Sequence, residues 1–512
     1  MVSFILRRIL VSVLILLAAS FLMYLLVAYS VDPLKDLRES SAANKDQLIT
    51  ARVQLLQLDV PPPLRWGLWL GGAAGCVIPF ANTCNLGATI ANAQVTNLLP
   101  NALGSTVQLV TLALLLAIVF GITIGIVTAL RQYSGLDNTM TFISFFLYSL
   151  PAFLVAVLLK EFIAISFNNF LDRPVVSVFW ALAIGVLVGA VWQSLIGGAV
   201  RQRLVVFVIS GASTTLLLWF MSVTGWFMAP GIGPVAMVAL VAAIALGVAA
   251  LVAGIRQRRA LLTAGINAVI AVVCYFTLQP LFDISSFGTV AILALVTIAV
   301  GLLSGYLVGG FDRGQNMRVG VLTAVLSAGL ILLDRYMQSW PAYLSESQIN
   351  GRPIATVGSV TPNLGGDFWI SGIDTFTHLL LPTITLLLIS FAGYTRYSRA
   401  GMLEVLNQDY IRTARAKGLP ERTVIVRHAF RNVLIPITTL IAFDVGALLG
   451  GAIITETVFA IPGMGLLFNL GLQRGDLNPV MGYFLVIASM AILFNFLADL
   501  AYASLDPRVR VR

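Results

Sequence analysis

Long apolar runs separated by short polar segments dominate the pattern of this chain. About 20 consecutive apolar residues are enough for an α-helix to cross a hydrocarbon core of about 30 Å. The runs that meet this requirement are 8–29, 103–130, 139–166, 175–199, 204–224, 234–254, 260–280, 288–309, 319–340, 376–396, 433–455 and 480–503. The pattern therefore predicts an all-α polytopic membrane protein with about 12 transmembrane helices.

The basic residues between the runs predict an orientation. Arg131, Arg201 and Arg256 lie in polar segments that fall on one side of the membrane, whereas the segments 225–233 and 281–288 on the other side carry almost no basic residues. Because basic loops stay on the cytoplasmic side, both termini are predicted to be cytoplasmic. The first run is too long for a removable signal peptide and lacks a small-residue cleavage site, so we expect it to remain as the first membrane helix.

Composition agrees with a membrane protein and excludes a soluble one. Hydrophobic residues make up 59% of the chain and charged residues 10%, and the mean hydropathy is +0.94. A net charge of +9 could suggest a nucleic-acid partner. The basic residues, however, cluster in short loops between apolar runs, as orientation in a membrane requires. We therefore expect a lipid bilayer around the chain and no nucleic acid.

A polar, basic stretch, 404–436, separates two of the apolar runs and reads EVLNQDYIRTARAKGLPERTVIVRHAFRNVLIP. It predicts two short helices. Asp409 leads the first helix and Gly418 ends it, and Pro420 suits the first turn of the second. The small residues Ala414 and Gly418 would let another protein approach the backbone closely. A charged loop of this size is typical of a surface offered to a soluble partner; the alternative is a basic loop that only orients the chain.

The run DYIRTARAKGL, with Ile435-Pro436 downstream, resembles the cytoplasmic coupling loop of permeases of binding-protein-dependent ABC importers. The resemblance is strongest to the dipeptide, oligopeptide and nickel branch. It implies that the loop docks into a cleft on an ATPase subunit. The residues to which it assigns ATPase coupling are Asp409, Tyr410, Arg412, Thr413, Ala414, Arg415, Lys417, Gly418 and Leu419.

The same resemblance divides the chain into two flanks of a permease core. Residues 1–172, which include FILRRIL and LQLDVPPPLRWGLWLGG, resemble the N-terminal part, with an extracellular segment at 30–102. Residues 376–512, which include GALLGGAIITETVFAIPGMG and DLAYASLDPRVR, resemble the C-terminal part, with the cytoplasmic coupling loop at 397–432.

The middle of the chain, 173–340, has no counterpart in that family. Its six apolar runs predict three transmembrane hairpins with basic cytoplasmic tips, followed by an extracellular loop at 341–375. An even number of spans keeps the downstream helices in their expected orientation. The GxxxG pairs at 185–189 and 301–305 are spaced for close packing of helices.

Few charges lie inside the apolar runs. Asp444 lies near the middle of 433–455, where an unpaired charge costs about 2.5–3.5 kcal/mol on insertion scales. It either lines a solute path or makes a hydrogen bond between helices, and both readings stay open. Lys160 with Glu161, and Asp334 with Arg335, are expected to reach toward the membrane interface.

The stretch 456–480 mixes apolar residues with Pro462, Gly463 and Gly465. It resembles the extracellular loop that dips back toward the pore in the permease family, where irregular backbone needs protein or water to satisfy it. Phe459, Pro462 and Met464 are expected to form part of a solute pathway, as a gate or docking surface; an ordinary surface loop is the alternative.

Two cysteines, Cys76 and Cys84, share the first extracellular segment, where a disulfide is permitted but not required. His378 and His428 are isolated, so neither predicts a metal site. The chain has no GxxxxGK[ST] sequence and no cluster of nucleophile, carboxylate pair or metal ligands. We therefore expect no catalytic residue and no cofactor in this chain, with ATP and Mg²⁺ bound by partner ATPase subunits.

The resemblance predicts a permease subunit of an ATP-driven bacterial importer, in the inner (cytoplasmic) membrane, for di- or oligopeptides. Its implied partners are a second permease subunit, two ABC ATPase subunits and an extracellular substrate-binding protein. An ion-coupled secondary transporter and an integral membrane enzyme are the alternatives. The sequence leaves open whether the solute is a dipeptide, an oligopeptide, a nickel chelate or haem.

Overall fold

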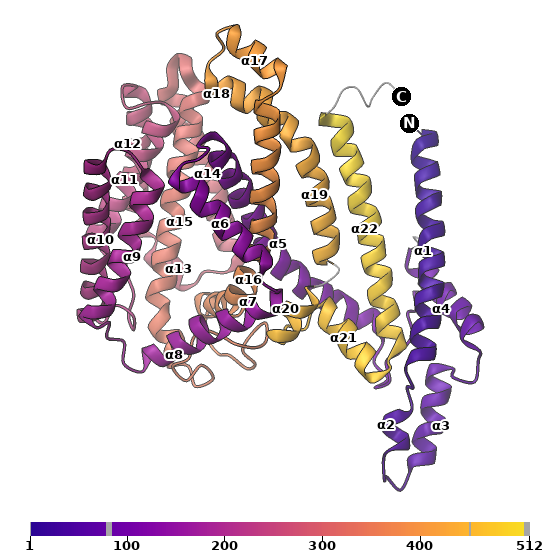
Figure 1. Ribbon diagram of the computed structural model, residues 1–512. Coiled ribbons are helices and arrows are strands. Elements are labelled where there is room, and N and C mark those ends of the chain that lie inside the picture. The colour runs from indigo at the N-terminus through magenta and orange to yellow at the C-terminus, as the bar shows by residue number, and fades with distance from the viewer. Residues whose placement is uncertain (1, 78–83, 450–451, 506–512) are drawn as a thin grey trace.

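The computed structural model describes residues 2–77, 84–449 and 452–505, and the chain is predominantly helical over these ranges (Figure 1). They contain no β-strand, only a single antiparallel bridge between Ala88 and Gln94. The prediction of an all-α fold is confirmed.

Eleven segments of the described ranges are helical, long and apolar enough to cross a membrane. One of them, 287–345, comprises two helices, α14 (Phe287–Gly309) and α15 (Arg313–Ser345), joined by one 3₁₀ turn. The prediction of a polytopic membrane protein with about 12 spans is confirmed by length and composition.

Two long helices, α5 (Val95–Leu130) and α16 (Phe368–Leu406), pack against each other at the centre of the molecule. Gly121 and Gly125 make this possible, because a Cβ at either position would collide with α16, at Tyr394 and Ser398 respectively. Small residues let helix backbones approach closely in a membrane, where van der Waals contact is a main source of association. On one side of this pair lie α1 (Val2–Ser30), α19 (Arg431–Leu449) and α22 (Leu477–Leu505) (Figure 1).

Three helix pairs lie on the other side of α5 and α16 (Figure 1). They are α9 (Val178–Ile196) with α10 (Val200–Val223), α11 (Pro234–Val252) with α12 (Arg258–Thr277), and α14 with α15. The GxxxG pairs of α9 and α14 face their partner helices: a Cβ at Gly301 would lie 2.7 Å from the Val321 Cα, and one at Gly189 would lie 2.8 Å from the Phe207 carbonyl oxygen. The predicted close packing at these pairs is confirmed.

The predicted span 139–166 is broken into pieces, so that prediction was wrong. Helix α6 (Gly135–Ser149) ends before Leu150, and α7 (Ala152–Leu159) begins after Pro151. A proline disfavours helical backbone at the residue before it, which accounts for the break. α7 continues through a π-helical turn, Lys160–Ile165, into α8 (Ser166–Leu171).

Of the charges expected to reach the interface, Lys160 and Asp334 make contacts with other parts of the protein, whereas Glu161 is exposed. Lys160 Nζ donates to the Val458 carbonyl oxygen at 3.4 Å. Asp334 is buried and accepts three hydrogen bonds, from the Ile232 N–H at 2.7 Å, from Gln338 Nε2 at 2.7 Å and from the Tyr275 hydroxyl at 3.1 Å. Such donors offset the cost of burying a carboxylate. The prediction was wrong for Asp334, two of whose partners, Ile232 and Tyr275, are remote in sequence; for the half-buried Lys160 it stays a prediction.

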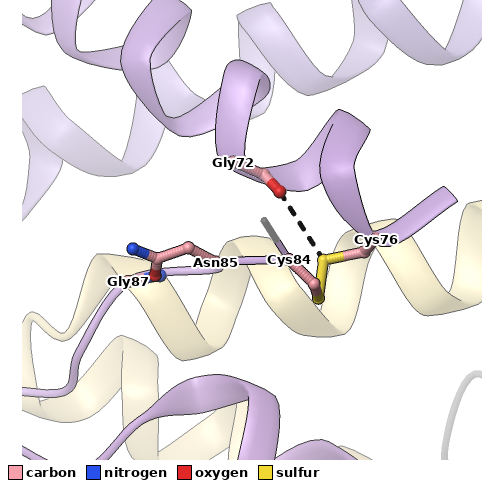
Figure 2. Close-up of a disulfide and its surroundings, with 5 residues drawn as sticks. All are labelled: Gly72, Cys76, Cys84, Asn85 and Gly87. Carbon is pink, nitrogen blue, oxygen red and sulfur yellow. Dashed lines mark hydrogen bonds between the residues drawn. A yellow bond between two sulfur atoms is a disulfide. The ribbon is translucent and has the colours of Figure 1, made fainter. Parts of the chain in front are cut away.

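The segment after α1 forms a small helical unit at one end of the molecule, with α2 (Lys35–Arg38), α3 (Lys45–Leu56) and α4 (Pro62–Val77) (Figure 1). Figure 2 shows that Cys76, near the end of α4, is joined by a disulfide to Cys84. The chain then passes close to α4, where the Asn85 N–H donates to the Gly72 carbonyl oxygen at 3.2 Å. A cavity of about 730 Å³ lies between α1, α3, α4 and the start of α22.

Candidate functional site

The first predicted helix of the polar stretch is present as α17 (Asp409–Ala416). Its apolar face, Ile411 and Ala414, is buried in a cluster with Met402 of α16 and Val433 of α19. Asp409 and the other polar residues face outward. The spacing of Ile411 and Ala414 by three residues explains this arrangement, since residues three apart share one face of a helix.

The end of α17 follows the glycine, as predicted. Gly418 has φ of +73°, and its N–H donates to the Arg415 carbonyl oxygen at 2.9 Å. The Leu419 N–H donates to the Ala414 carbonyl oxygen at 3.4 Å. A left-handed residue that satisfies the last carbonyls is a common helix end, and glycine adopts it without steric cost.

The two small residues, Ala414 and Gly418, differ in how much space they leave for a partner protein. Ala414 is buried against its own chain, so its side chain presents no surface to another protein, contrary to prediction. At Gly418 nothing lies within 4 Å of the position that a Cβ would take. Among these two, only Gly418 leaves space for a close approach.

The second predicted helix is not a separate short helix. α18 (Glu421–Thr423) begins after Pro420, passes through the π-helical turn Val424–Phe430, and continues into α19. Nothing in 421–435 terminates a helix, because Pro436 is the first proline or glycine after Pro420. The prediction of its start is confirmed, whereas its end was wrong.

Polar contacts hold α17 to this continuous helix. Asn432 Nδ2 donates to the Tyr410 hydroxyl at 2.7 Å. The Arg415 guanidinium donates to both carboxylate oxygens of Glu421, at 2.7 and 3.3 Å, and thereby lowers the pKa of Glu421. Since both contacts are exposed, we expect each to contribute little stability by itself.

The predicted coupling residues thus form one exposed patch at the end of the molecule away from α2 and α3 (Figure 1). We call this patch the α17 surface. It consists of Asp409, Tyr410, Arg412, Thr413, Arg415, Lys417, Gly418 and Leu419.

The residues predicted to form a gate lie where two short helices meet, α20 (Ile453–Val458) and α21 (Met464–Arg474). Phe459 and Met464 are buried, in clusters that contain Leu109 and Tyr24 respectively, whereas Pro462 is exposed. Helices α20, α21 and the start of α22 occupy most of the stretch 456–480, so the prediction of an irregular loop was wrong for most of its length. Only Pro462 of the three presents an open surface in this chain.

A residue that sequence reasoning missed, Glu456, holds this junction together. Its buried carboxylate accepts hydrogen bonds from the Thr106 hydroxyl at 2.7 Å and from the Leu466 N–H at 3.0 Å. The Thr106 oxygen in turn accepts from the Met464 N–H at 2.8 Å. A Cβ at Gly463 would collide with the same carboxylate. An acid directly after a long apolar run was the available signal.

Asp444 lies partly buried on α19 and interacts with the Tyr394 hydroxyl of α16. That hydroxyl is buried and makes no hydrogen bond of ordinary geometry within the described part of the chain. The acid therefore lies between two long helices. This position suits the inter-helix reading, and a role in a solute path stays a prediction.

Two hydrogen bonds join the start of α22 to the segment before α5. The Ile90 N–H donates to Asp476 Oδ2 at 3.0 Å, and Asn478 Nδ2 donates to the Ala88 carbonyl oxygen at 2.7 Å. Burial raises the pKa of Asp476 to about 6, because an ionised carboxyl is poorly solvated there. Across the described ranges, no group of three or more His, Cys, Asp or Glu side chains could hold a metal ion.

Comparison with known proteins places this geometry in context. The family model of the "binding-protein-dependent transport system inner membrane component" matches residues 350–511, which include α17 and Glu456. The dipeptide transport system permease protein DppB of Escherichia coli strain K12 is 50% identical over 138 residues, covering 27% of this chain and 41% of that protein. The oligopeptide transport system permease protein OppB of Mycobacterium tuberculosis strain H37Rv is 35% identical over 231 residues, covering 43% and 69%. The chain thus spans less than half the length of the first of these relatives.

Proposed function

This chain belongs to the family of binding-protein-dependent transport system inner membrane components, and from that membership we propose a transport role. In this proposal it is the permease subunit of an ATP-driven importer and itself breaks no covalent bond. The two relatives described above are named for dipeptide and oligopeptide transport, so short peptides are the proposed cargo. An external binding protein delivers the peptide.

The observation that carries the proposal is the α17 surface. A short helix with a buried apolar face and an exposed charged face stands on the ends of α16 and α19, two long helices of the molecule. A partner that binds α17 differently in two states will shift both helices, since ligands move a conformational equilibrium only by differential contact. We assign that role to two ATPase subunits, on which ATP and Mg²⁺ bind.

The solute path is proposed to form between this chain and a second permease subunit. Asp444, Phe459, Pro462 and Met464 are its proposed residues in this chain. Since Phe459 and Met464 are buried, opening at this place requires α20 and α21 to move rather than two side chains to turn. Glu456 joins both helices to α5, so they are expected to move as one unit.

The proposed setting is the bacterial inner membrane. The α17 surface and both termini then face the cytoplasm, and α2, α3 and the disulfide face outward, where oxidation of cysteines is permitted. We further propose that 1–172 and 376–512 form the permease core, that 341–375 is an external loop, and that 173–340 is an added layer of three hairpins. Their separate packing, α9 with α10 and α14 with α15, supports that division.

A cross-linking experiment tests the coupling role. In a cysteine-free background, Arg412→Cys is introduced and the complex is treated in membranes with a short thiol-reactive cross-linker carrying a second, amine-reactive group. We expect a product with an ATPase subunit whose yield changes when ATP is added. Arg201→Cys at the start of α10 is the matched control, since it is another exposed arginine on the proposed cytoplasmic side, and it is expected to give no such product.

The alternative, an ion-coupled secondary transporter, predicts a different result. Peptide uptake into proteoliposomes would then follow an ion gradient without ATP. Uptake that needs ATP and persists after the gradient is collapsed by an ionophore supports the proposal, whereas the reverse outcome rejects it.

A further inference from the structure

A cleft between α6 and α16 contains a set of polar groups that the transport role does not use. Its volume is about 360 Å³, within the usual range of about 300–1,000 Å³ for small-ligand pockets. Phe145 and Tyr148 of α6 form one wall, and Gly393, Arg396 and Ala400 of α16 form the other. The residues of each wall are three or four apart, so each wall is one face of a helix.

Arg396 is the unbalanced charge in this cleft. Its guanidinium carbon lies 4.3 Å from the centre of the Tyr148 ring and 4.8 Å from that of Phe145. Aromatic faces attract a cation but accept no conventional N–H hydrogen bond, and in the described part of the chain Arg396 has neither an acidic partner nor a hydrogen bond. Its donors are therefore left for another acceptor.

The neighbouring arginine in the cleft wall is already neutralised. Arg399 donates from Nε to Asp137 Oδ1 at 2.7 Å and from Nη2 to Oδ2 at 3.0 Å. Asp137 also accepts the Tyr133 N–H at 3.0 Å, so it has no further role in balancing Arg396. The cleft retains one net positive charge.

Two buried hydroxyls point to the class of ligand. Ser144 and Thr395 are among the residues that line the cleft and are 1% and 2% exposed, and neither of their hydroxyl oxygens has a hydrogen-bond partner among the described residues. Unsatisfied buried hydroxyls are uncommon, because each costs about 1–3 kcal/mol. Hydroxyl and guanidinium groups all donate to oxyanions, so an oxyanion is the class of ligand that suits this set of donors.

The position of the cleft relative to the membrane favours a phosphate group as the oxyanion. The apolar run of α16 extends from Leu379 to Gly393 and stops just before Arg396. Arg396 therefore lies at the proposed cytoplasmic boundary of the hydrocarbon core, the level of the lipid headgroups. Basic pockets between transmembrane helices on that side are suited to anionic headgroups. We propose that the α6–α16 cleft binds a phosphate group. In this proposal the phosphate belongs to the headgroup of an anionic lipid of the cytoplasmic leaflet.

Binding can be measured on the intact complex with its partner subunits. Dioleoylphosphatidylglycerol is titrated in detergent and bound lipid is counted by native mass spectrometry. Arg396→Gln is expected to weaken binding about tenfold, as for loss of a hydrogen-bonded charge, and Ser144→Ala and Thr395→Val about threefold each. Arg396→Lys keeps the charge but loses the forked donors, so it is expected to fall between the parent and Arg396→Gln.

The controls separate a site from general attraction. Arg201→Gln removes an exposed arginine elsewhere on the same side and is expected to bind like the parent. Dioleoylglycerol has the same chains without phosphate and is expected not to bind at the cleft. Equal binding by Arg396→Gln and the parent, equal loss in Arg201→Gln, or equal binding of dioleoylglycerol would each overturn the proposal.

Two soluble probes identify the source. Displacement of the lipid by millimolar inorganic phosphate supports a site that accepts the group in either form, and failure to displace it, with the Arg396 dependence intact, supports the lipid alone. Displacement by trialanine but not by phosphate would overturn the proposal in favour of a carboxylate. The choice of a lipid source rests on the proposed cytoplasmic orientation, but every readout here is lipid binding and not transport, so failure of peptide uptake and failure of lipid binding are distinguishable.

Discussion

Arg399 of α16 and Asp137 of α6 are joined by two hydrogen bonds, although they lie far apart in the sequence. The pair fixes the start of α6, because Asp137 also accepts the backbone N–H of Tyr133 in the turn before it. The side chain of Asp137 is 2% exposed and that of Arg399 is 27% exposed. The pair therefore connects the α5–α6 turn to the helix that leads to α17.

Replacing Asp137 by asparagine is expected to destabilise the protein. The amide offers one acceptor in place of two and leaves the Arg399 charge unpaired, which costs about 1.5–3 kcal/mol for a hydrogen bond to a charged group. The measurement is the thermal unfolding midpoint of the purified complex. Asp172→Asn changes an exposed acid and should leave the midpoint in place. Equal midpoints for Asp137→Asn and the parent would contradict the structural role.

The open space at Gly418 gives a prediction about coupling. Gly418→Trp should abolish peptide uptake and peptide-stimulated ATP hydrolysis while the chain still inserts in the membrane, because the indole occupies the space that we propose for the docked ATPase subunit. Gly254→Trp is a closely matched control: Gly254 also has positive φ, +84°, and open space around the missing Cβ. Both variants carry similar backbone strain, so normal uptake in both would reject docking at Gly418.

The Glu456 junction can be tested by removing one donor. Thr106→Val removes one of the two hydrogen-bond donors to the Glu456 carboxylate and leaves the Met464 N–H without its acceptor, and we expect a loss of about 2–4 kcal/mol in the free energy of unfolding. Hydrogen exchange should rise first in α20 and α21. Thr111→Val makes the same change on an exposed face of α5 and should have little effect on exchange. Unchanged protection in Thr106→Val would show that the junction is held by packing alone.

Asp476 predicts a specific pH dependence. Its pKa is raised from 3.8 to about 6 by burial, so the folded protein holds a proton that the unfolded chain has released. Stability contributed by this group is therefore full below about pH 4, falls as the pH rises to about 6, and is lost above that, by about 2–3 kcal/mol in all.

The comparison of Asp476→Asn with the parent isolates this effect. The difference in unfolding free energy between them should grow between about pH 4 and pH 6 and then stay constant, with the variant more stable at high pH. Asp59→Asn alters an exposed acid and should follow the parent throughout. A constant difference over the whole range would disprove the titration of Asp476.

What could be predicted from the sequence was local. The spacing of Ile411 and Ala414 and the position of Gly418 were enough to place α17, since each acts within one or two turns. The roles of Asp334 and Glu456 could not be read in the same way. Their donors, at Ile232 and Thr106, lie 102 and 350 residues away, so only the folded chain brings them together.

The end of the second helix was also missed for a physical reason. A helix continues until something stops it, and after Pro420 the next glycine or proline is Pro436, which α19 accommodates inside the helix. The lone break in the span 139–166, by contrast, could have been predicted from Pro151.

The unbroken helix from Glu421 to Leu449 has a mechanical consequence. At about 1.5 Å per residue it is a rod of about 43 Å, one end of which carries the Glu421 contact to α17. If the helix pivots at that end by about 10°, its far end moves by about 7.5 Å. In the orientation that we propose, a small rotation at the cytoplasmic end of this helix is therefore enough to displace its outer end, where we propose the solute path.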